Sequence, residues 1–266
     1  MAVDDDLDLL EAACRAGGEI ARKRFQEGCK SWSKQGGSPV TEADLEVDAF
    51  LRRTLTEARP GYGWLSEESV DDCSRLDHET LFIVDPIDGT VAFLKGRAHF
   101  TVCAAVVRNG VAVAGVVYNP LLDHLYKAKT GGGAFCNDAP IQPSACADLA
   151  GCAMLGDRAL LTQPPWPHMR VETRNSVAYR VTLVADGSFD ATVSLSAKRD
   201  WDLAAADIIL REAGGVITDR HGHELRFNGQ DARQPSMIAA GPKLHHAILA
   251  HLDGRAPDAP CDNKSP

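Results

Sequence analysis

Residues 81–90 read LFIVDPIDGT, and this stretch decides how the rest of the chain is interpreted. Its four leading apolar residues predict a short buried strand. We expect the strand to end at Asp85-Pro86, because proline lacks the backbone N–H that a sheet ladder requires. The carboxylates of Asp85 and Asp88 bracket a turn stiffened by the proline. Such a turn can direct both carboxylates to one point at the carboxyl end of the strand.

Two carboxylates at one point are typical of a magnesium site. Mg²⁺ prefers oxygen ligands in octahedral geometry. The protein usually contributes two or three carboxylates and a backbone carbonyl to its coordination. The backbone N–H groups of Gly89 and Thr90 can hold a phosphate if a helix begins there. The motif alone is equally consistent with a plain turn, in which Asp85 caps the turn and Asp88-Gly89 supplies ordinary turn residues.

Two further acidic segments favour the metal-site interpretation. The segment 64–69 reads WLSEES, so that one of Glu67 and Glu68 can face inward as a ligand while its neighbour faces water. The segment 199–215 predicts a helix with an acidic start and a Gly-Gly stop. Taken separately, the first would be a solvated loop and Asp202 an N-cap residue.

Composition limits the partners and the compartment. The chain has 266 residues, is 44% hydrophobic and carries a net charge of −9, which suits a globular protein and disfavours binding to a nucleic-acid polymer. We expect no membrane association, because no apolar run approaches the roughly 20 residues that span a bilayer. The acidic start fits neither secretion nor organelle import. Eight cysteines without a CxxC pair then indicate core thiols of a cytoplasmic protein.

The periodicity predicts helices and a meander in the first half and alternating elements in the second. Helices are expected at 4–27 and from Thr41 to about Ala58, and the strands 100–107 and 111–118 form a hairpin across Asn109-Gly110. The second half alternates as α/β layering: helix 176–186, strand 190–195, helix 202–213, strand 215–218. We divide the chain into 1–145, which carries most metal ligands, 146–254, which supplies Asp202 and substrate contacts, and a disordered tail at 255–266.

The order and spacing of three segments resemble the motifs of the inositol-monophosphatase-like phosphatases. The segments are Trp64–Ser69, Asp85–Thr90 and Trp201–Gly215, and similarity also covers Gly37–Asp44 and Tyr126–Asn137. The resemblance extends over nearly the whole chain. It implies a mixed α/β fold, the layered αβαβα sandwich of the sugar-phosphatase type, and a homodimer.

The resemblance also implies a lithium-sensitive site for two or three Mg²⁺ ions. Glu67, Asp85 and the carbonyl of Ile87 would bind the first metal, and Asp85, Asp88 and Asp202 the second. A third, looser metal would lie on Glu67 and waters, and Gly89 and Thr90 would hold the phosphate. The implied reaction is hydrolysis of a small soluble phosphate monoester by a metal-activated water.

The residue that accepts the proton of the attacking water is open between two candidates. One hypothesis is that Thr90, oriented by Asp44, helps to accept it, and the other assigns that role to Glu67. Asp44 also has a purely structural interpretation, because Thr41-x-x-Asp44 is close to a capping box and would place it at N3 of a helix.

Other reaction classes have less support. An aspartyl-phosphate enzyme typically has Asp-x-Asp, whereas Asp85 and Asp88 are separated by two residues. Cys103 and Arg108 are one residue too close for the Cys-x₅-Arg of a cysteine phosphatase, and the chain lacks a P-loop. A catalytically silent Mg²⁺-binding regulatory protein is the non-enzymatic alternative, although every acidic position of the motif set is occupied.

Substrate choice follows from departures from the family pattern. The family's inositol and histidinol phosphatases commonly have a substrate-binding glutamate where this chain has Leu195, and a Gly-Thr-Ala type segment where it has Asn175–Ala178. The segment 34–44 looks more like the 3′(2′),5′-bisphosphate nucleotidases of sulfur assimilation. The preferred substrate is therefore 3′-phosphoadenosine 5′-phosphate; inositol 1-phosphate, histidinol phosphate and sugar phosphates are the alternatives. Lys198 and Arg199 would meet the second phosphate unless they form a solvated face, with Ser176 as a further substrate contact.

Overall fold

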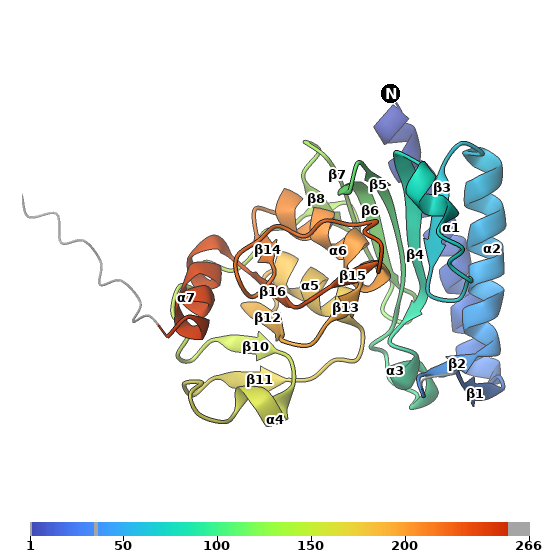
Figure 1. Cartoon of the computed structure of the whole chain (residues 1–266). Helices are drawn as coiled ribbons and strands as arrows, with labels where there is room; N and C mark the ends of the chain where they lie inside the picture. The colour runs from blue at the N-terminus through green and yellow to red at the C-terminus, as the bar shows by residue number, and fades with distance from the viewer. Residues whose placement is uncertain (1, 35–36, 255–266) are drawn as a thin grey trace, which may run out of the picture.

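The computed structural model describes residues 2–34 and 37–254, and it arranges them in five alternating layers of helices and sheets (Figure 1). The expected αβαβα sandwich is confirmed. The predicted tail at 255–266 lies outside the described residues. The proposed boundary between 145 and 146 stays a prediction: each large sheet lies on one side of it, but two helices of the second half pack on the sheet of the first.

The first layer is a pair of helices, α1 (Ala2–Glu27) and α2 (Glu42–Ala58), which pack on each other and on one face of the larger sheet. A short antiparallel ribbon of β1 (Ser31–Ser33) and β2 (Pro39–Thr41) connects them. Thr41 is the N-cap of α2 and forms the predicted capping box with Asp44. Gly28 follows α1 with a φ of 80°, a left-handed conformation that favours glycine at a helix end.

The second layer is a seven-stranded sheet in the order β3-β4-β5-β6-β7-β8-β9. β3 pairs with β4 in parallel, and every other pair is antiparallel. The predicted hairpin across Asn109-Gly110 is confirmed, with both residues at positive φ. The strands are β3 (Gly63–Ser66), β4 (Thr80–Asp88), β5 (Thr101–Arg108), β6 (Val111–Asn119), β7 (His124–Lys129), β8 (Ala134–Cys136) and β9 (Ala139–Pro140).

The end of β4 corrects one expectation. The strand does not stop at Asp85-Pro86 but runs to Asp88, with a register shift between Asp85, opposite Cys103, and Asp88, opposite Thr101. Such an irregularity accommodates a residue without a backbone donor, which is where proline is tolerated in a sheet. Both aspartates therefore belong to one bulged strand end.

The third layer, α5 (Val177–Ala185) and α6 (Asp200–Glu212), packs on the opposite face of the seven-stranded sheet. The helices come close to it: a Cβ at Gly115 of β6 would lie 2.7 Å from the carbonyl oxygen of Ala205. Because glycine allows this approach, the start of α6 can reach the end of β4. Helix α6 begins two residues before the predicted 202, which moves Asp202 from the expected N-cap position to N3.

The fourth layer is a five-stranded sheet in the order β11-β10-β12-β16-β14, and α7 (Pro242–Leu252) covers its outer face as the fifth layer (Figure 1). Its strands are β10 (Ala153–Leu155), β11 (Arg170–Glu172), β12 (Ala191–Ser194), β14 (Val216–Thr218) and β16 (Met237–Ala240). Smaller elements are η1 (Ser74–Asp77), α3 (Thr90–Leu94), α4 (Arg158–Leu161), and the ribbon of β13 (Lys198–Arg199) with β15 (Arg233–Gln234). None of the helices described here is both long and apolar enough to cross a bilayer.

The cysteines agree only in part with the expectation of core thiols. All seven cysteines within the described residues are free, and Cys14, Cys103 and Cys152 are buried. Cys73 is exposed and precedes η1, so the prediction is wrong for this residue.

Candidate active site

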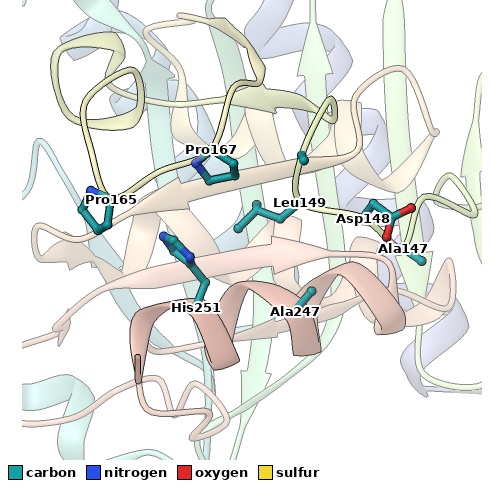
Figure 2. Close-up of a pocket in the computed structure, with 8 residues that line it drawn as sticks. Ala147, Asp148, Leu149, Pro165, Pro167, Ala247 and His251 are labelled. Atoms are coloured by element: carbon teal, nitrogen blue, oxygen red, sulfur yellow. The ribbon is translucent and has the colours of Figure 1, made fainter. Parts of the chain in front are cut away.

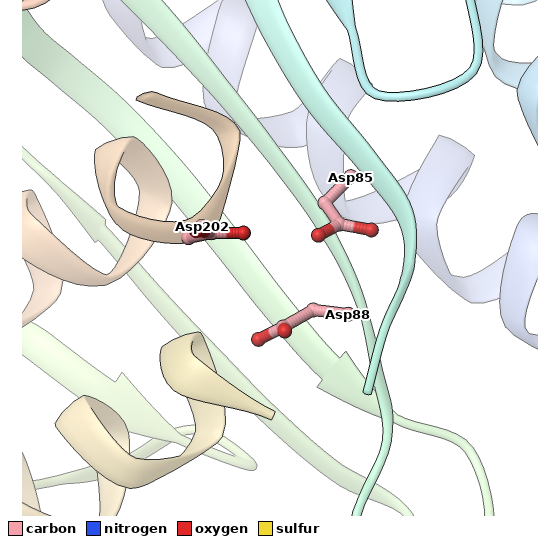
Figure 3. Close-up of side chains that lie close together, drawn as sticks. All are labelled: Asp85, Asp88 and Asp202. Carbon is pink, nitrogen blue, oxygen red and sulfur yellow. The ribbon is translucent and has the colours of Figure 1, made fainter. Parts of the chain in front are cut away.

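Three carboxylates from distant parts of the chain converge at the end of β4. Asp85 and Asp88 come from the bulged strand and Asp202 from the first turn of α6, and one oxygen of each lies within 4.8 Å of the others. Figure 3 shows the three side chains directed toward a common centre. The sequence prediction that these aspartates meet is thereby satisfied within the reach of one bridging cation.

The start of α5 holds Asp88 in place. Its Oδ2 accepts hydrogen bonds from Ser176 Oγ at 2.6 Å and from the backbone N–H of Ala178 at 2.7 Å. Both donors lie at the N-terminus of a helix, where unpaired N–H groups and the helix dipole favour a negative charge. Because Oδ2 takes these bonds, Oδ1 is left for a cation.

The start of α6 holds Asp202. Its Oδ2 accepts the backbone N–H of Arg199 at 2.9 Å, as the N3 carboxylate of a capping box does. The neighbouring Asp200, which the sequence analysis did not single out, is fully buried and fixes this helix start. Its carboxylate accepts Asn228 N at 2.7 Å and Gln234 Nε2 at 2.8 Å.

The cluster is electrostatically unbalanced without a cation. Burial, followed by repulsion from Glu67, Asp88 and Asp202, raises the pKa of Asp85, whose Oδ1 is buried and has no hydrogen-bond partner among the described residues. Burial raises the pKa of Asp88 to about 6, and burial with repulsion from Asp88 raises the pKa of Asp202 to about 7. An orphaned carboxylate oxygen within a set of hard oxygen donors fits Mg²⁺.

The metal-free protein is expected to lose stability as the pH rises from about 4 to about 7. Folded Asp88 and Asp202 keep their protons up to about 6 and 7, whereas both release them near 3.8 when unperturbed. Stability from this source is complete below the unfolded pKa and is lost as the pH passes the folded values. Because Mg²⁺ requires ionised ligands, it should raise the melting temperature more at about pH 7.5 than at about pH 5. Thermal denaturation with EDTA or Mg²⁺ at both pH values tests this, and equal increments would contradict it.

The adjacent glutamates differ from the expected arrangement. Lys34 Nζ binds both, at 2.9 Å from Glu67 Oε1 and 2.6 Å from Glu68 Oε1. The Glu68 side chain is only 4% exposed against 23% for Glu67, so the neighbour does not face water as predicted. The lysine accounts for this, because a buried carboxylate is tolerated when it is paired. Glu67 lies outside the three-aspartate cluster. Of the neighbouring charges, however, that of Glu67 has the largest effect on the pKa of Asp85.

Thr90 and Asp44 are in contact, as the sequence hypothesis requires. Thr90 Oγ lies 3.1 Å from Asp44 Oδ1 and 3.2 Å from the carbonyl oxygen of Ile87, so its hydroxyl can donate to either. The other oxygen of Asp44 accepts the backbone N–H of Thr41 at 2.9 Å. The structural and the catalytic interpretations of Asp44 are therefore compatible. Gly89, with a φ of 98°, is the N-cap of α3 and directs Thr90 toward this network.

The three predicted substrate contacts are not brought to one place. Ser176 is fully buried and its hydroxyl is bound to Asp88, so it lies behind the aspartate rather than at a substrate surface. Arg199 donates to the carbonyl oxygen of Asp231 at 3.1 Å and lies over the ring of Trp201. Lys198 alone of the three lines a cavity of about 310 Å³, together with Arg180. The only sequence signal for Arg180 is that it is the single charged residue of the segment 177–185.

A second cavity lies apart from these residues. It has a volume of about 550 Å³. It is bordered by α7, by the loop that precedes β10 and by the loop that follows α4 (Figure 2). His251 of α7 lines it, and its ring lies 4.8 Å from that of Trp166. None of the residues predicted from the sequence lines this cavity.

Comparisons with known proteins show which family the chain belongs to. The model of the inositol monophosphatase family matches residues 3–255. The chain is 35% identical to an inositol-1-monophosphatase of Mesorhizobium japonicum, covering 91% of this chain and 92% of the relative. It is 31% identical to the 3′(2′),5′-bisphosphate nucleotidase CysQ of Aggregatibacter actinomycetemcomitans, covering 85% and 88%. The crystal structure of the suppressor protein SuhB of Bartonella henselae superposes with a TM-score of 0.81 at 28% identity, covering 93% and 98%. The chain therefore belongs to the inositol monophosphatase family and is a phosphoric monoester hydrolase.

Proposed function

We propose that the protein is a Mg²⁺-dependent, Li⁺-sensitive phosphatase of a small phosphate monoester. The observation that carries this proposal is the cluster of Asp85, Asp88 and Asp202, with one orphaned oxygen and a mutual repulsion that a bound cation would relieve. These three side chains, the Ile87 carbonyl and Glu67 would hold two or three Mg²⁺ ions. When bound, Mg²⁺ supplies charge neutralisation for the phosphoryl oxygens and the departing alkoxide.

The residues around the cluster position the ester and move the proton. The backbone N–H groups of Gly89 and Thr90 would hold the scissile phosphate. The Thr90 hydroxyl, bonded to the buried carboxylate of Asp44, would take part in removing the proton from the attacking water. Burial raises the pKa of Asp44, which makes its carboxylate a better acceptor. Glu67 is the competing acceptor, and Lys34 occupies one of its oxygens.

Replacement of Asp44 by asparagine is expected to lower kcat about 10- to 100-fold, because Thr90 loses its charged acceptor. The capping role alone predicts a different outcome: lower thermal stability with a nearly unchanged kcat. Steady-state phosphate release and melting temperature separate the two. Asp207→Asn is the matched control, since Asp207 is also buried in a helix but is paired with Arg211 outside the cluster. A kcat within about threefold of the wild type would restrict Asp44 to capping.

For the substrate we propose 3′-phosphoadenosine 5′-phosphate, converted to AMP and phosphate. Leu195 lines the cavity of Lys198 where the family's inositol and histidinol phosphatases commonly carry a glutamate, and Lys198 offers a cation for a second phosphate. A relative at 31% identity is named a bisphosphate nucleotidase. Inositol 1-phosphate is the second candidate, favoured by the name of the relative at 35% identity.

A phosphate-release screen with Mg²⁺ tests the proposal. We expect turnover of 3′-phosphoadenosine 5′-phosphate to exceed that of inositol 1-phosphate and to be inhibited by Li⁺. A preference of about a hundredfold for the inositol ester would overturn the substrate ranking. Binding of Mg²⁺ without phosphate release from any ester of a broad panel would favour the silent regulatory alternative.

We further propose that the protein acts in the cytoplasm as a homodimer. The dimer rests on the resemblance to the family. The cytoplasmic location rests on the cysteines, which form no disulfide among those described. Light scattering after size-exclusion chromatography measures the oligomeric state, and a mass near 28.6 kDa would contradict the dimer.

A further inference from the structure

The cavity of about 310 Å³ that Lys198 lines is connected to the aspartate cluster by charge, because two of its lining residues interact electrostatically with Asp88 and Asp202. Arg180 of α5, Leu195 after β12 and Lys198 of β13 all contribute to its wall. The charges of Arg180 and Lys198 act on both Asp88 and Asp202, so the two cations and the two aspartates form one electrostatic unit.

Arg180 is placed unusually for an arginine. The residue is only 8% exposed, yet its Nε atom has no hydrogen-bond partner and its guanidinium forms no ion pair among the described residues. Buried polar groups are almost always paired, and an unpaired buried charge is costly. The two aspartates that balance Arg180 at longer range are those that Mg²⁺ would neutralise. If Mg²⁺ neutralises these aspartates, the guanidinium would be left without an anion.

The other polar groups of the wall suit an anion. Lys198 Nζ lies 3.1 Å from Ser196 Oγ, and the hydroxyl of Ser194 also borders the cavity. Burial, followed by the charge of Arg180, lowers the pKa of Lys198, as expected when two cations share a site. One carboxylate also lines the cavity, that of Asp157, but it is exposed and caps α4 through the N–H of Ala159.

We propose that Arg180 and Lys198 form a subsite for a second anionic group of the substrate, so that the enzyme selects phosphate monoesters that carry another phosphate. This inference rests on the proposed function, because it places the scissile ester at the aspartates. Arg180 supplies a planar fork of donors, which suits phosphate oxygens, and Lys198 adds a point charge. The subsite would favour esters with a second anionic group, and Arg180 would be the residue that determines this selectivity.

A structural role for Arg180 makes a different prediction. If the guanidinium only balances Asp88 and Asp202, its removal should weaken Mg²⁺ binding and reduce the turnover of every ester equally. If it binds a second anion, the loss should depend on whether the ester has one. The test therefore compares two substrates that differ only in that group.

The experiment measures kcat/KM for 3′-phosphoadenosine 5′-phosphate and for adenosine 3′-phosphate, which lacks only the second phosphate. In Arg180→Gln the ratio of the two values should fall at least tenfold, chiefly through a higher KM for the bisphosphate, because a charge-assisted bidentate contact is lost. Arg180→Lys should restore part of the ratio. Arg158→Gln, on α4 and lining a different cavity, is the matched control and should leave it unchanged. An equal loss for both esters would overturn the proposal.

Two further measurements keep the test decisive. Lys198→Met changes a partly exposed residue of a short ribbon, so it tests the subsite if Arg180→Gln does not fold. It should also lower the ratio of kcat/KM for the bisphosphate to kcat/KM for adenosine 3′-phosphate. If no ester is hydrolysed, the proposed function fails, and calorimetric titration with 3′-phosphoadenosine 5′-phosphate tests the subsite by itself. A Kd raised about tenfold in the variant supports it, and an unchanged Kd overturns it.

Discussion

Replacement of Asp85 by asparagine is expected to lower phosphate release by about 10³-fold or more while raising the melting temperature of the metal-free protein. The two effects have one cause. Asp85 is 1% exposed, its Oδ1 has no hydrogen-bond partner among the described residues, and its pKa is raised by burial and by four neighbouring carboxylates. A neutral amide relieves that repulsion but removes a ligand shared by the proposed metals.

The measurement pairs thermal denaturation in EDTA with phosphate release in Mg²⁺, both at about pH 8, above the pKa values that Asp88 and Asp202 have in the folded protein. The rise in melting temperature caused by Mg²⁺ in the wild type should be largely lost in Asp85→Asn. Asp207→Asn again serves as the control, because its partner Arg211 makes its removal destabilising without touching the cluster. A variant that is less stable without metal, or that keeps more than about a tenth of the activity, would show that Asp85 is structural.

The sequence was sufficient for the parts of the site that are encoded in adjacent residues. The segment 85–90 and the acidic start of α6 stand out locally, and their meeting follows from layered packing. Thr41 and Asp44 are similarly local, because a capping box is defined by a spacing of three residues. The hairpin across Asn109-Gly110 was predictable for the same reason.

The features that the sequence did not reveal depend on tertiary contacts. The continuation of β4 through Pro86 depends on a bulge against β5, which no local signal announces. Glu68 looked solvated because its partner, Lys34, lies 34 residues away. The sequence predicts Ser176 as a substrate contact, but the packing of α5 on the sheet places it under Asp88. Arg180 has no local signal of a buried role, because a charge in a helix is usually on the solvent side.

Replacement of Gly89 by alanine is expected to lower both activity and stability, because Gly89 joins the strand of the aspartates to the helix of Thr90. Its φ of 98° is a conformation that L-residues rarely adopt. A Cβ there would lie 2.8 Å from the carbonyl oxygen of His99 and 3.0 Å from the backbone nitrogen of Ser176. Both are backbone atoms, so relief of the clash must move Ser176 or the turn. Because Ser176 positions Asp88, we expect kcat/KM to fall at least about 100-fold and stability by about 2–3 kcal/mol.

Gly96→Ala separates strain from displacement. Gly96 also has a positive φ, of 65°, but a Cβ at this position would meet no atom within 4 Å beyond its immediate chain neighbours. The Gly96→Ala variant should therefore lose only the stability that the unfavourable backbone conformation costs, about 1 kcal/mol. Its activity should equal that of the wild type. Chemical denaturation and phosphate release on both variants provide the comparison. If Gly89→Ala and Gly96→Ala lose the same stability and both stay active, the turn tolerates a side chain, and the geometry that holds Asp88 does not depend on the close approach of residue 89 to Ser176.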